Sequence, residues 1–310
     1  MNLQVNDSRT SAAAGGGFVR EMLSLLKVNV REYGMYIALF VIMLIFSILT
    51  DGLFMSSRNI SNLLDATGYI AVLAVGMTLV IVIRHIDLSV GYAAGFMGAI
   101  AAILLTQYGF PVYLTIPIIL LIGIAAGLIT GFLVASVGIP AFVATLAGML
   151  IFRGALLQVT EKTGTINVRD EWFNAIGNGY IPAIAKVGGL NLSSLLLGAV
   201  AIILYILSEI HNRRNKLKYN FEVVSGGIFA LKLVFVSAII AYITWILAGY
   251  NGISWTVVIM LLVVIVYHFL TTKTVLGRHI YAVGSNPEAA HLSGINVKKI
   301  TYVVFGSMGM

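Results

Sequence analysis

The sequence predicts an all-α fold: a polytopic α-helical integral membrane protein with about eight complete spans and a truncated ninth. Hydrophobic residues make up 59% of the 310 residues, charged residues make up 10%, and the mean hydropathy is +0.99. A soluble domain carries about 25% charged residues. This chain therefore has too little polar surface to cover a globule in water, and membrane lipid is its expected solvent. The lack of cysteine excludes disulfides and thiolate metal sites.

The first 33 residues form a polar arm, which contains an Ala-Gly stretch at 12–17 that is typical of a linker. The first apolar run, 35–49, comes too late for a secretory signal and no small-residue cleavage site follows it. We interpret this run as the first membrane span and as its own insertion signal. Residues 34–310 are then expected to form one membrane domain.

Further apolar runs follow, and each predicts a membrane helix. They lie at 68–83, 89–105, 112–137, 141–158, 195–210, 228–248 and 253–269. A last run, 300–310, rises about 16 Å as a helix, about half of a hydrocarbon core. We therefore expect the chain to be incomplete at its C-terminus.

Basic residues predict the orientation, because cytoplasmic loops carry an excess of Lys and Arg. Twelve of them share the side of the N-terminus: Arg9, Arg20, Lys27, Arg31, Arg213, Arg214, Lys216, Lys218, Lys273, Arg278, Lys298 and Lys299. The opposite loops hold four: Arg58, Lys162, Arg169 and Lys186. The N-terminus is therefore expected in the cytoplasm. The net charge of +7 reflects this topology and not nucleic-acid binding, because no basic patch is interleaved with exposed aromatics.

A polar segment, 284–297, is built like a short helix that docks on a partner. Asn286 is a good N-cap, Pro287 suits the first helical position, and the charge of Glu288 complements the helix N-terminus. Ala289 and Ala290 are small enough for close approach, and Gly294 can end the helix. The orientation above places this segment in the cytoplasm.

A second polar stretch, 84–91, interrupts two apolar runs almost without a loop. It is either a tight cytoplasmic turn or a break in a helix that lines a substrate pathway. Asp87 is placed to cap the following span, with or without contact to the pathway. That span is rich in small residues, which favours close helix packing; they are Gly91, Ala93, Ala94, Gly95, Gly98 and Ala101.

Several blocks then occur in order along the chain: Asn59-Ile60-Ser61-Asn62-Leu63-Leu64, Gly76-Met77-Thr78-Leu79-Val80-Ile81, Ile86-Asp87-Leu88-Ser89-Val90-Gly91, Gly131-Phe132-Leu133-Val134, 138–146, Met149, Arg153-Gly154 and 277–295. With these blocks the chain resembles the permeases of bacterial sugar ABC importers, of the ribose, xylose and galactose type. The resemblance runs from about Asn59 to the end. The last block resembles the loop by which such permeases engage their ATPase.

The resemblance implies a transport subunit of the bacterial inner membrane without catalytic residues. Its implied partners are a cytoplasmic ABC ATPase, a periplasmic sugar-binding protein that docks on the outer loop 161–189, and a second permease copy, the same or homologous. ATP and Mg²⁺ would bind the ATPase, because this chain has no Gly-x-x-x-x-Gly-Lys-Ser/Thr phosphate loop. The implied coupling loop is 272–299, and its contact residues are Arg278, Gly284, Asn286, Glu288, Ala289, Ala290, Ser293 and Gly294.

Four residues are candidates for the substrate pathway: Asp87, Ser89, Thr145 and Arg153. Arg153 lies inside the fifth span near its outer end, where it either anchors the helix or faces the sugar. Lys232, one turn inside the seventh span, is expected to snorkel. His268 and His291 lack partner ligands at metal spacing, so no metal site is expected.

The chain departs from the family at two places. Arg84 and His85 stand where the family usually has two glycines. The basic stretch 211–218 and the span after it add length, as in the xylose or multiple-monosaccharide branch, which favours xylose or a related pentose or hexose.

Two other classes fit the composition. A secondary active transporter for small polar solutes would need intramembrane acids for ion coupling, and Asp87 is the acid near a core position. A membrane enzyme would need clustered His, Asp or Glu on facing helices, and no His-Glu-x-x-His or paired-aspartate pattern occurs.

Overall fold

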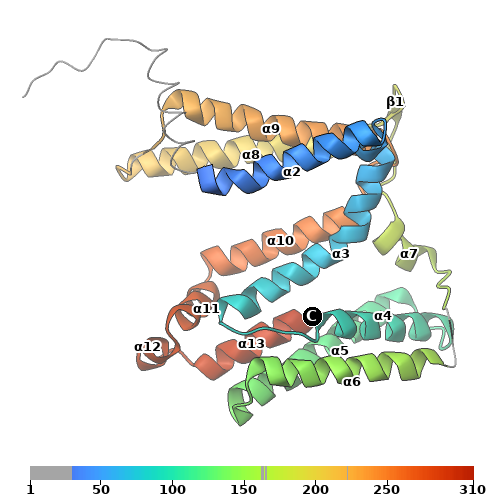
Figure 1. The fold of residues 1–310 in the computed structure, drawn as a ribbon, viewed down its shortest axis with the longest axis vertical. Helices are drawn as coiled ribbons and strands as arrows, with labels where there is room; N and C mark the ends of the chain where they lie inside the picture. The colour runs from blue at the N-terminus through green and yellow to red at the C-terminus, as the bar shows by residue number, and fades with distance from the viewer. Residues whose placement is uncertain (1–29, 162–163, 165, 222) are drawn as a thin grey trace, which may run out of the picture. The chain divides into compact units, whose positions relative to one another are not determined.

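The computed structural model describes residues 30–161, 164, 166–221 and 223–310, and their side chains from residue 34 onward (Figure 1). The expected polar arm, 1–33, therefore falls almost wholly outside the described residues. In chain order the helices are α2 (Val30–Leu49), α3 (Ser57–Val82), α4 (Val90–Thr106), α5 (Val112–Phe132), α6 (Ala141–Glu161), α7 (Glu171–Asn178), α8 (Leu192–Lys218), α9 (Gly226–Ala248), α10 (Trp255–Lys273), α11 (Val275–Ser285), α12 (Pro287–Leu292) and α13 (Val297–Gly309). A 3₁₀ turn, η1 (Leu53–Met55), a π turn, η2 (Leu133–Val137), and a two-stranded hairpin of β1 (Lys186–Val187) and β2 (Leu190–Asn191) complete the described fold.

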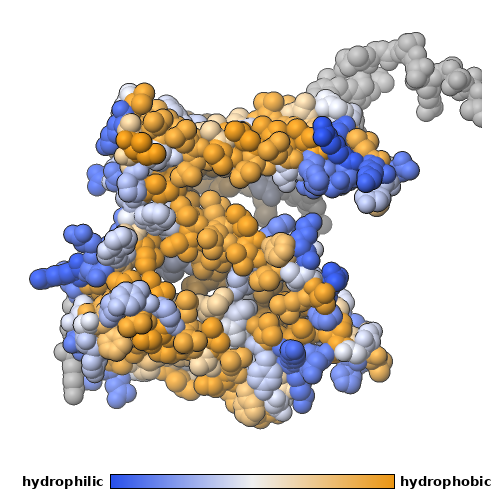
Figure 2. All heavy atoms as spheres, turned by 180° about the vertical axis from the view of Figure 1, so that it is seen from behind, coloured by the Kyte–Doolittle hydropathy of each residue, from blue (hydrophilic) through white to orange (hydrophobic). Residues whose placement is uncertain are grey.

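The all-α membrane fold is confirmed. Within the part of the chain that the structure describes, six helices are long and apolar enough to cross a membrane: α3, α5 with η2, α6, α8, α9 and α10. Two shorter apolar helices, Gly34–Leu49 and Val90–Thr106, correspond to the first and third expected spans. Apolar side chains dominate the visible face of the helices in Figure 2, and hydrophilic residues gather toward helix ends. A surface of this kind is stable only against lipid.

Helix ends differ from the expected spans, because hydropathy finds the part of a helix in lipid and not its caps. The run expected at 195–210 belongs to a helix that begins at Leu192, where Asn191 accepts a hydrogen bond from the Ser194 amide at 3.2 Å. The helix continues to Lys218, and Lys216 and Lys218 complement the negative end of its dipole. Polar residues thus extend the helix beyond the apolar window.

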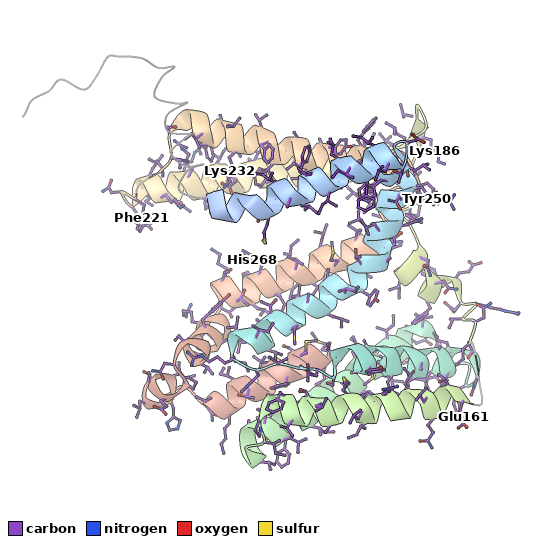
Figure 3. The ribbon with its side chains drawn as sticks, viewed as in Figure 1. Glu161, Lys186, Phe221, Lys232, Tyr250 and His268 are labelled. Atoms are coloured by element: carbon purple, nitrogen blue, oxygen red, sulfur yellow. The ribbon has the colours of Figure 1, made fainter. Side chains whose placement is uncertain are left out.

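The chain divides into two compact units, residues 1–62 with 181–253 and residues 63–180 with 254–310. The first unit contains the antiparallel pair α8 and α9. A Cβ on Gly198 would overlap the side chain of Thr244, so this glycine allows the two helices to approach closely. Figure 3 shows Phe221 at the tip of the α8–α9 hairpin and Lys232 along α9.

Charged side chains also connect α8 with α9. Lys232 Nζ donates to Glu209 Oε2 at 2.9 Å, so Lys232 pairs with an acid on the neighbouring helix. The sequence predicted only that Lys232 would snorkel and did not predict this ion pair. The Arg213 guanidinium lies 4.5 Å from the ring centroid of Phe229. These two contacts fix how α8 and α9 are aligned near the basic end of the hairpin.

The buried core of the second unit is formed mainly by side chains of α3, α11 and α13, and Val80, Val304 and Phe305 in it are fully buried. Its closest contact is between α5 and α13. Gly123, Gly127 and Gly131 recur every four residues on the buried face of α5. A Cβ on Gly123 or Gly127 would overlap a carbonyl oxygen of α13, that of Gly309 or Phe305. The stripe therefore brings the two backbones into contact, as small-xxx-small helix pairs do.

The glycines of α4 do not play the part that the sequence suggested. Among the described residues, a Cβ on Gly91 or Gly98 would meet no atom within 4 Å. Gly95 allows an ordinary contact with Leu156. The tight packing expected for the third span is instead found on α5, because the face that a helix turns to its neighbour depends on the tertiary fold.

Opposite ends of the second unit carry different features. At one end, α7 docks by hydrogen bonds from Thr256 Oγ1 to the carbonyls of Ile176 and Gly177, at 3.3 and 3.1 Å, and Tyr180 donates to Asp65 at 2.9 Å. At the other end lie α11, α12 and the connection 83–89 between α3 and α4. This second end holds the candidate site.

Candidate substrate pathway and coupling segment

The polar stretch between α3 and α4 is an irregular connection of residues 83–89. It separates α3 from α4 and has no regular structure at residues 85–87, which agrees with both forms expected from the sequence. Arg84 sits in it with φ +65°, in the left-handed region. That conformation costs a non-glycine residue about 1–2 kcal/mol, so surrounding contacts must hold it.

Asp87 organises the end of this connection. Its side chain is buried, and Oδ1 accepts hydrogen bonds from the Ser89 amide at 2.8 Å and from the Ser89 hydroxyl at 2.6 Å. The N-cap residue of α4 is Ser89 and not Asp87. Asp87 therefore fixes the turn two residues before the helix, because an Asp side chain readily closes such a loop on the backbone amide two positions later.

Asp87 and Ser89 both line a cavity of about 150 Å³. That space has room for about five water molecules. Most of its wall is apolar and comes from α4, α5 and α13, with Leu73 of α3 and Phe152 of α6. Thr130 adds a hydroxyl. Apolar walls with a few fixed polar groups are typical of small-molecule sites.

The other two expected pathway residues lie outside this wall. Thr145 is fully buried, and its hydroxyl donates to the carbonyl of Ile86 at 3.2 Å, so it ties α6 to the connection that bears Asp87. Arg153 is exposed, and its guanidinium lies 5.9 Å from the ring centroid of Tyr92. The fold thus brings Asp87, Ser89 and Thr145 together and leaves Arg153 as a cation–π contact on the flank of α4.

The helix expected within 284–297 is present as α12, and its caps are confirmed. Asn286 Oδ1 accepts from the amides of Glu288 and Ala289 at 3.0 and 3.1 Å, and Pro287 occupies the first helical turn. Gly294 has φ +83°; its amide bonds to the carbonyl of His291, and the Ile295 amide bonds to that of Ala290. These two bonds form a Schellman ending, which favours glycine at this position.

The residues expected to contact the ATPase do not share one surface. Glu288, Ala289 and Ser293 are exposed, as are Asn286 and Gly294, and Arg278 is exposed on α11. Ala290 is buried in the core of the unit instead. A Cβ on Gly284 would overlap the carbonyl oxygen of Val82, so Gly284 serves a helix contact. Gly284 and Ala290 are therefore small because they pack closely within the unit. From the sequence, this packing role could not be distinguished from contact with a partner.

The sequence reasoning missed Leu292, whose side chain is 87% exposed at the end of α12. Its apolar surface is thereby available to a partner that docks on α12. The signal was available, because Leu292 is the one large apolar side chain between Asn286 and Gly294.

The Asp87 turn and the coupling segment, residues 272–299, adjoin one another. The Arg84 guanidinium donates to the carbonyl of Ser285, the last residue of α11. The His85 ring lies 6.0 Å from that of Phe305 in a stacked arrangement, and burial lowers the pKa of His85 below its usual value. His85 is therefore neutral near pH 7, and Arg84 supplies the positive charge of this turn.

The comparison with known proteins follows this geometry. Residues 59–310 match the model of a family described as branched-chain amino acid transport system / permease component. The chain belongs to this permease family.

Individual members of the family cover most of the chain. The xylose transport system permease protein XylH of Haemophilus influenzae is 39% identical over 93% of this chain and 75% of its own length. XylH of Escherichia coli K12 is 34% identical over 98% of this chain and 74% of its own length. The ribose import permease protein RbsC of H. influenzae is 31% identical over 90% of this chain and 65% of its own length. No solved structure matches the chain.

A substitution at Gly294 should test the role of α12. A valine would face open space but would carry the penalty of a left-handed backbone, about 1–2 kcal/mol, and would disturb the Schellman ending. We expect Gly294→Val to lower transport while leaving the protein in the membrane, and Gly294→Asn to retain most of it, since Asn tolerates this conformation. Uptake divided by membrane abundance measures the effect.

The matched control is Gly52→Val, which has the same backbone sign, φ +82°, and equally open space in a loop of the first unit. If both valine variants lost the same fraction of uptake, the loss would come from general strain and not from α12.

Proposed function

We propose that this chain is the membrane-spanning permease subunit of an ATP-binding-cassette importer for a monosaccharide, with xylose as the preferred sugar. The observation that carries the proposal is the 39% identity to a xylose transport system permease over 93% of the chain. The family description names amino-acid systems, so a branched-chain amino acid is the competing substrate class.

The geometry agrees with a sugar better than with an aliphatic amino acid. Asp87 and Ser89 place a carboxylate and a hydroxyl on one cavity wall, and Thr130 adds another hydroxyl. Carboxylates are strong acceptors for sugar hydroxyls. Asp87 Oδ1 and the hydroxyls of Ser89 and Thr130 already have partners within the chain, so a sugar would bond to their remaining acceptor positions.

The partners of this subunit are part of the proposal. A cytoplasmic ATPase, which binds ATP and Mg²⁺, would dock on the exposed face of α12 around Glu288, Ala289 and Leu292. A periplasmic sugar-binding protein would dock at α7, where Trp172 is 82% exposed. A second permease, identical or homologous, would complete the pathway, and this chain itself would carry out no catalysis.

The test is reconstitution in proteoliposomes with a cytoplasmic ABC ATPase and a periplasmic sugar-binding protein of a xylose importer. We expect uptake of labelled xylose with ATP inside, none with a non-hydrolysable analogue, and no effect of ionophores. Uptake driven by an ion gradient without ATP would indicate a secondary transporter. Uptake of labelled leucine in place of xylose would reassign the substrate.

The proposed orientation in the inner membrane gives a separate prediction. The chain has no cysteine, so single cysteines report accessibility without background. We expect a membrane-impermeant maleimide to label Glu171→Cys, next to Trp172 on α7, in intact spheroplasts. Asn215→Cys on α8 and Leu292→Cys on α12 should react only after the membrane is opened. Labelling of Leu292→Cys from outside would contradict the proposed ATPase contact.

A further inference from the structure

The end of α3 and the connection 83–89 that follows it each make one contact with the end of α11. Arg84 donates from its guanidinium to the carbonyl of Ser285. Directly beside it, Gly284 approaches so closely that a Cβ would overlap the carbonyl oxygen of Val82, the last residue of α3. The end of α3 is therefore pressed against the end of α11 at the point where α12 begins.

Arg84 is an unusual residue for its backbone conformation. The left-handed region is populated mainly by Gly and, less often, by Asn or Asp. Arg84 occupies it at φ +65°, and this conformation aims a long cationic side chain at the Ser285 carbonyl. That carbonyl belongs to the last turn of α11, where helix carbonyls lack intrahelical partners and the dipole attracts a cation. Strain on one side of the contact is thus matched by a favourable site on the other.

Two residues, His85 and Ile86, separate Arg84 from Asp87. Between them, the Ile86 carbonyl accepts the Thr145 hydroxyl, and beyond them Asp87 holds Ser89 at the cavity wall. Ser285 is followed immediately by Asn286, the N-cap of α12. A continuous path therefore runs from α12 through Ser285 and Arg84 to the carboxylate that lines the cavity.

We propose that Arg84 is a positioning residue that ties the Asp87-bearing connection to α12, so that a displacement of α12 is transmitted to the cavity. Its role in transport rests on the proposed function. The tie itself does not, and it can be measured on the chain alone.

The first experiment measures the tie. Spin labels on Ile86→Cys and Leu292→Cys, both exposed positions, report the distance between the connection and α12 in the purified full chain in nanodiscs. With Arg84 present we expect one narrow distance distribution. Arg84→Gly removes the donor and also relieves the left-handed backbone, so the protein should fold while the distribution broadens or shifts. An unchanged distribution would overturn the tie.

The second experiment measures its use. In the reconstituted importer we expect Arg84→Gly to lower sugar uptake per ATP hydrolysed at least about fivefold, the lower range of measured couplings between sites. The matched control is Asn220→Gly, which relieves a left-handed residue at φ +55° after α8, in the other unit. Arg84→Lys keeps the charge but loses the planar fork of donors, so it should recover part of the uptake.

The outcomes separate the two proposals. Normal uptake per ATP in Arg84→Gly together with a broadened distance would overturn the transport role of Arg84. If the distance distribution broadens in Arg84→Gly but the wild-type protein transports no sugar with ATP, the contact between Arg84 and Ser285 stands and the proposed function is overturned. Equal losses in Arg84→Gly and Asn220→Gly would assign the effect to glycine at a turn and would also overturn the role of Arg84.

Discussion

Replacing Gly127 with valine should remove most of the folded protein. The Cβ of a residue at this position would overlap the carbonyl oxygen of Phe305, and backbone atoms cannot rotate away as a side chain can. The two helices would have to separate, which opens the core around Phe305 and Val304. Overpacking in a well-packed interior costs about 1–3 kcal/mol, and we expect the upper end or more here. Detergent extraction followed by size-exclusion chromatography and a thermal melt measures the loss.

The matched control is Gly154→Val on α6. A Cβ there would meet no atom within 4 Å among the described residues, and α6, like α5, is long and apolar enough to cross a membrane. We expect Gly154→Val to give a monodisperse protein with a melting temperature close to that of the wild type. A melting temperature for Gly127→Val equal to that of the control would show that α5 and α13 do not meet as described.

The second large effect is expected at Asp87. Alanine leaves the buried Ser89 amide without its partner, a cost of about 1–3 kcal/mol, and removes the only carboxylate among the residues that line the cavity. We expect Asp87→Ala to abolish uptake and to lower membrane abundance. Asp87→Asn keeps an acceptor oxygen but loses the charge, and a charge-assisted bond exceeds a neutral one by about 1 kcal/mol or slightly more. Uptake per folded molecule should therefore fall about tenfold.

Two further variants interpret that result. Ser89→Ala removes the hydroxyl partner at 2.6 Å but keeps the amide contact and the carboxylate, so it should lose less uptake than Asp87→Asn. Asp51→Asn changes an exposed loop carboxylate and should transport normally. Wild-type uptake by Asp87→Asn would limit Asp87 to fixing the turn and would remove it from the substrate pathway.

Features that depend on neighbouring residues in the chain could be predicted. Composition gave the membrane class, and the apolar runs gave the spans, since burial in lipid is a property of each segment. The caps of α12 followed from Asn286, Pro287 and Gly294 for the same reason: a cap is made by residues within one turn of each other.

Features that join distant segments could not. Arg84 and Ser285 are 201 residues apart, and Lys232 lies 23 residues from Glu209. In a membrane protein, apolar residues that face lipid and those that face other helices are chemically alike, so a sequence does not say which faces meet. This is why the packing role of Gly284 and Ala290 was not separated from partner contact, and why Thr145 proved to bind Ile86 instead of lining the cavity.

The contact between α5 and α13 has a mechanical consequence. Where large side chains of two packed helices interdigitate, one helix cannot slide along the other unless the helices first move apart. The face of α5 at Gly123, Gly127 and Gly131 has no side chains that could interdigitate in this way. α13 lies on this flat face. The N-terminal end of α13 follows α12 in the chain, and Met308 and Gly309 near its C-terminal end form part of the cavity wall. Because packed helices permit small shear motions, we expect a displacement of α13 along α5 to change the width of the cavity that Met308 and Gly309 line.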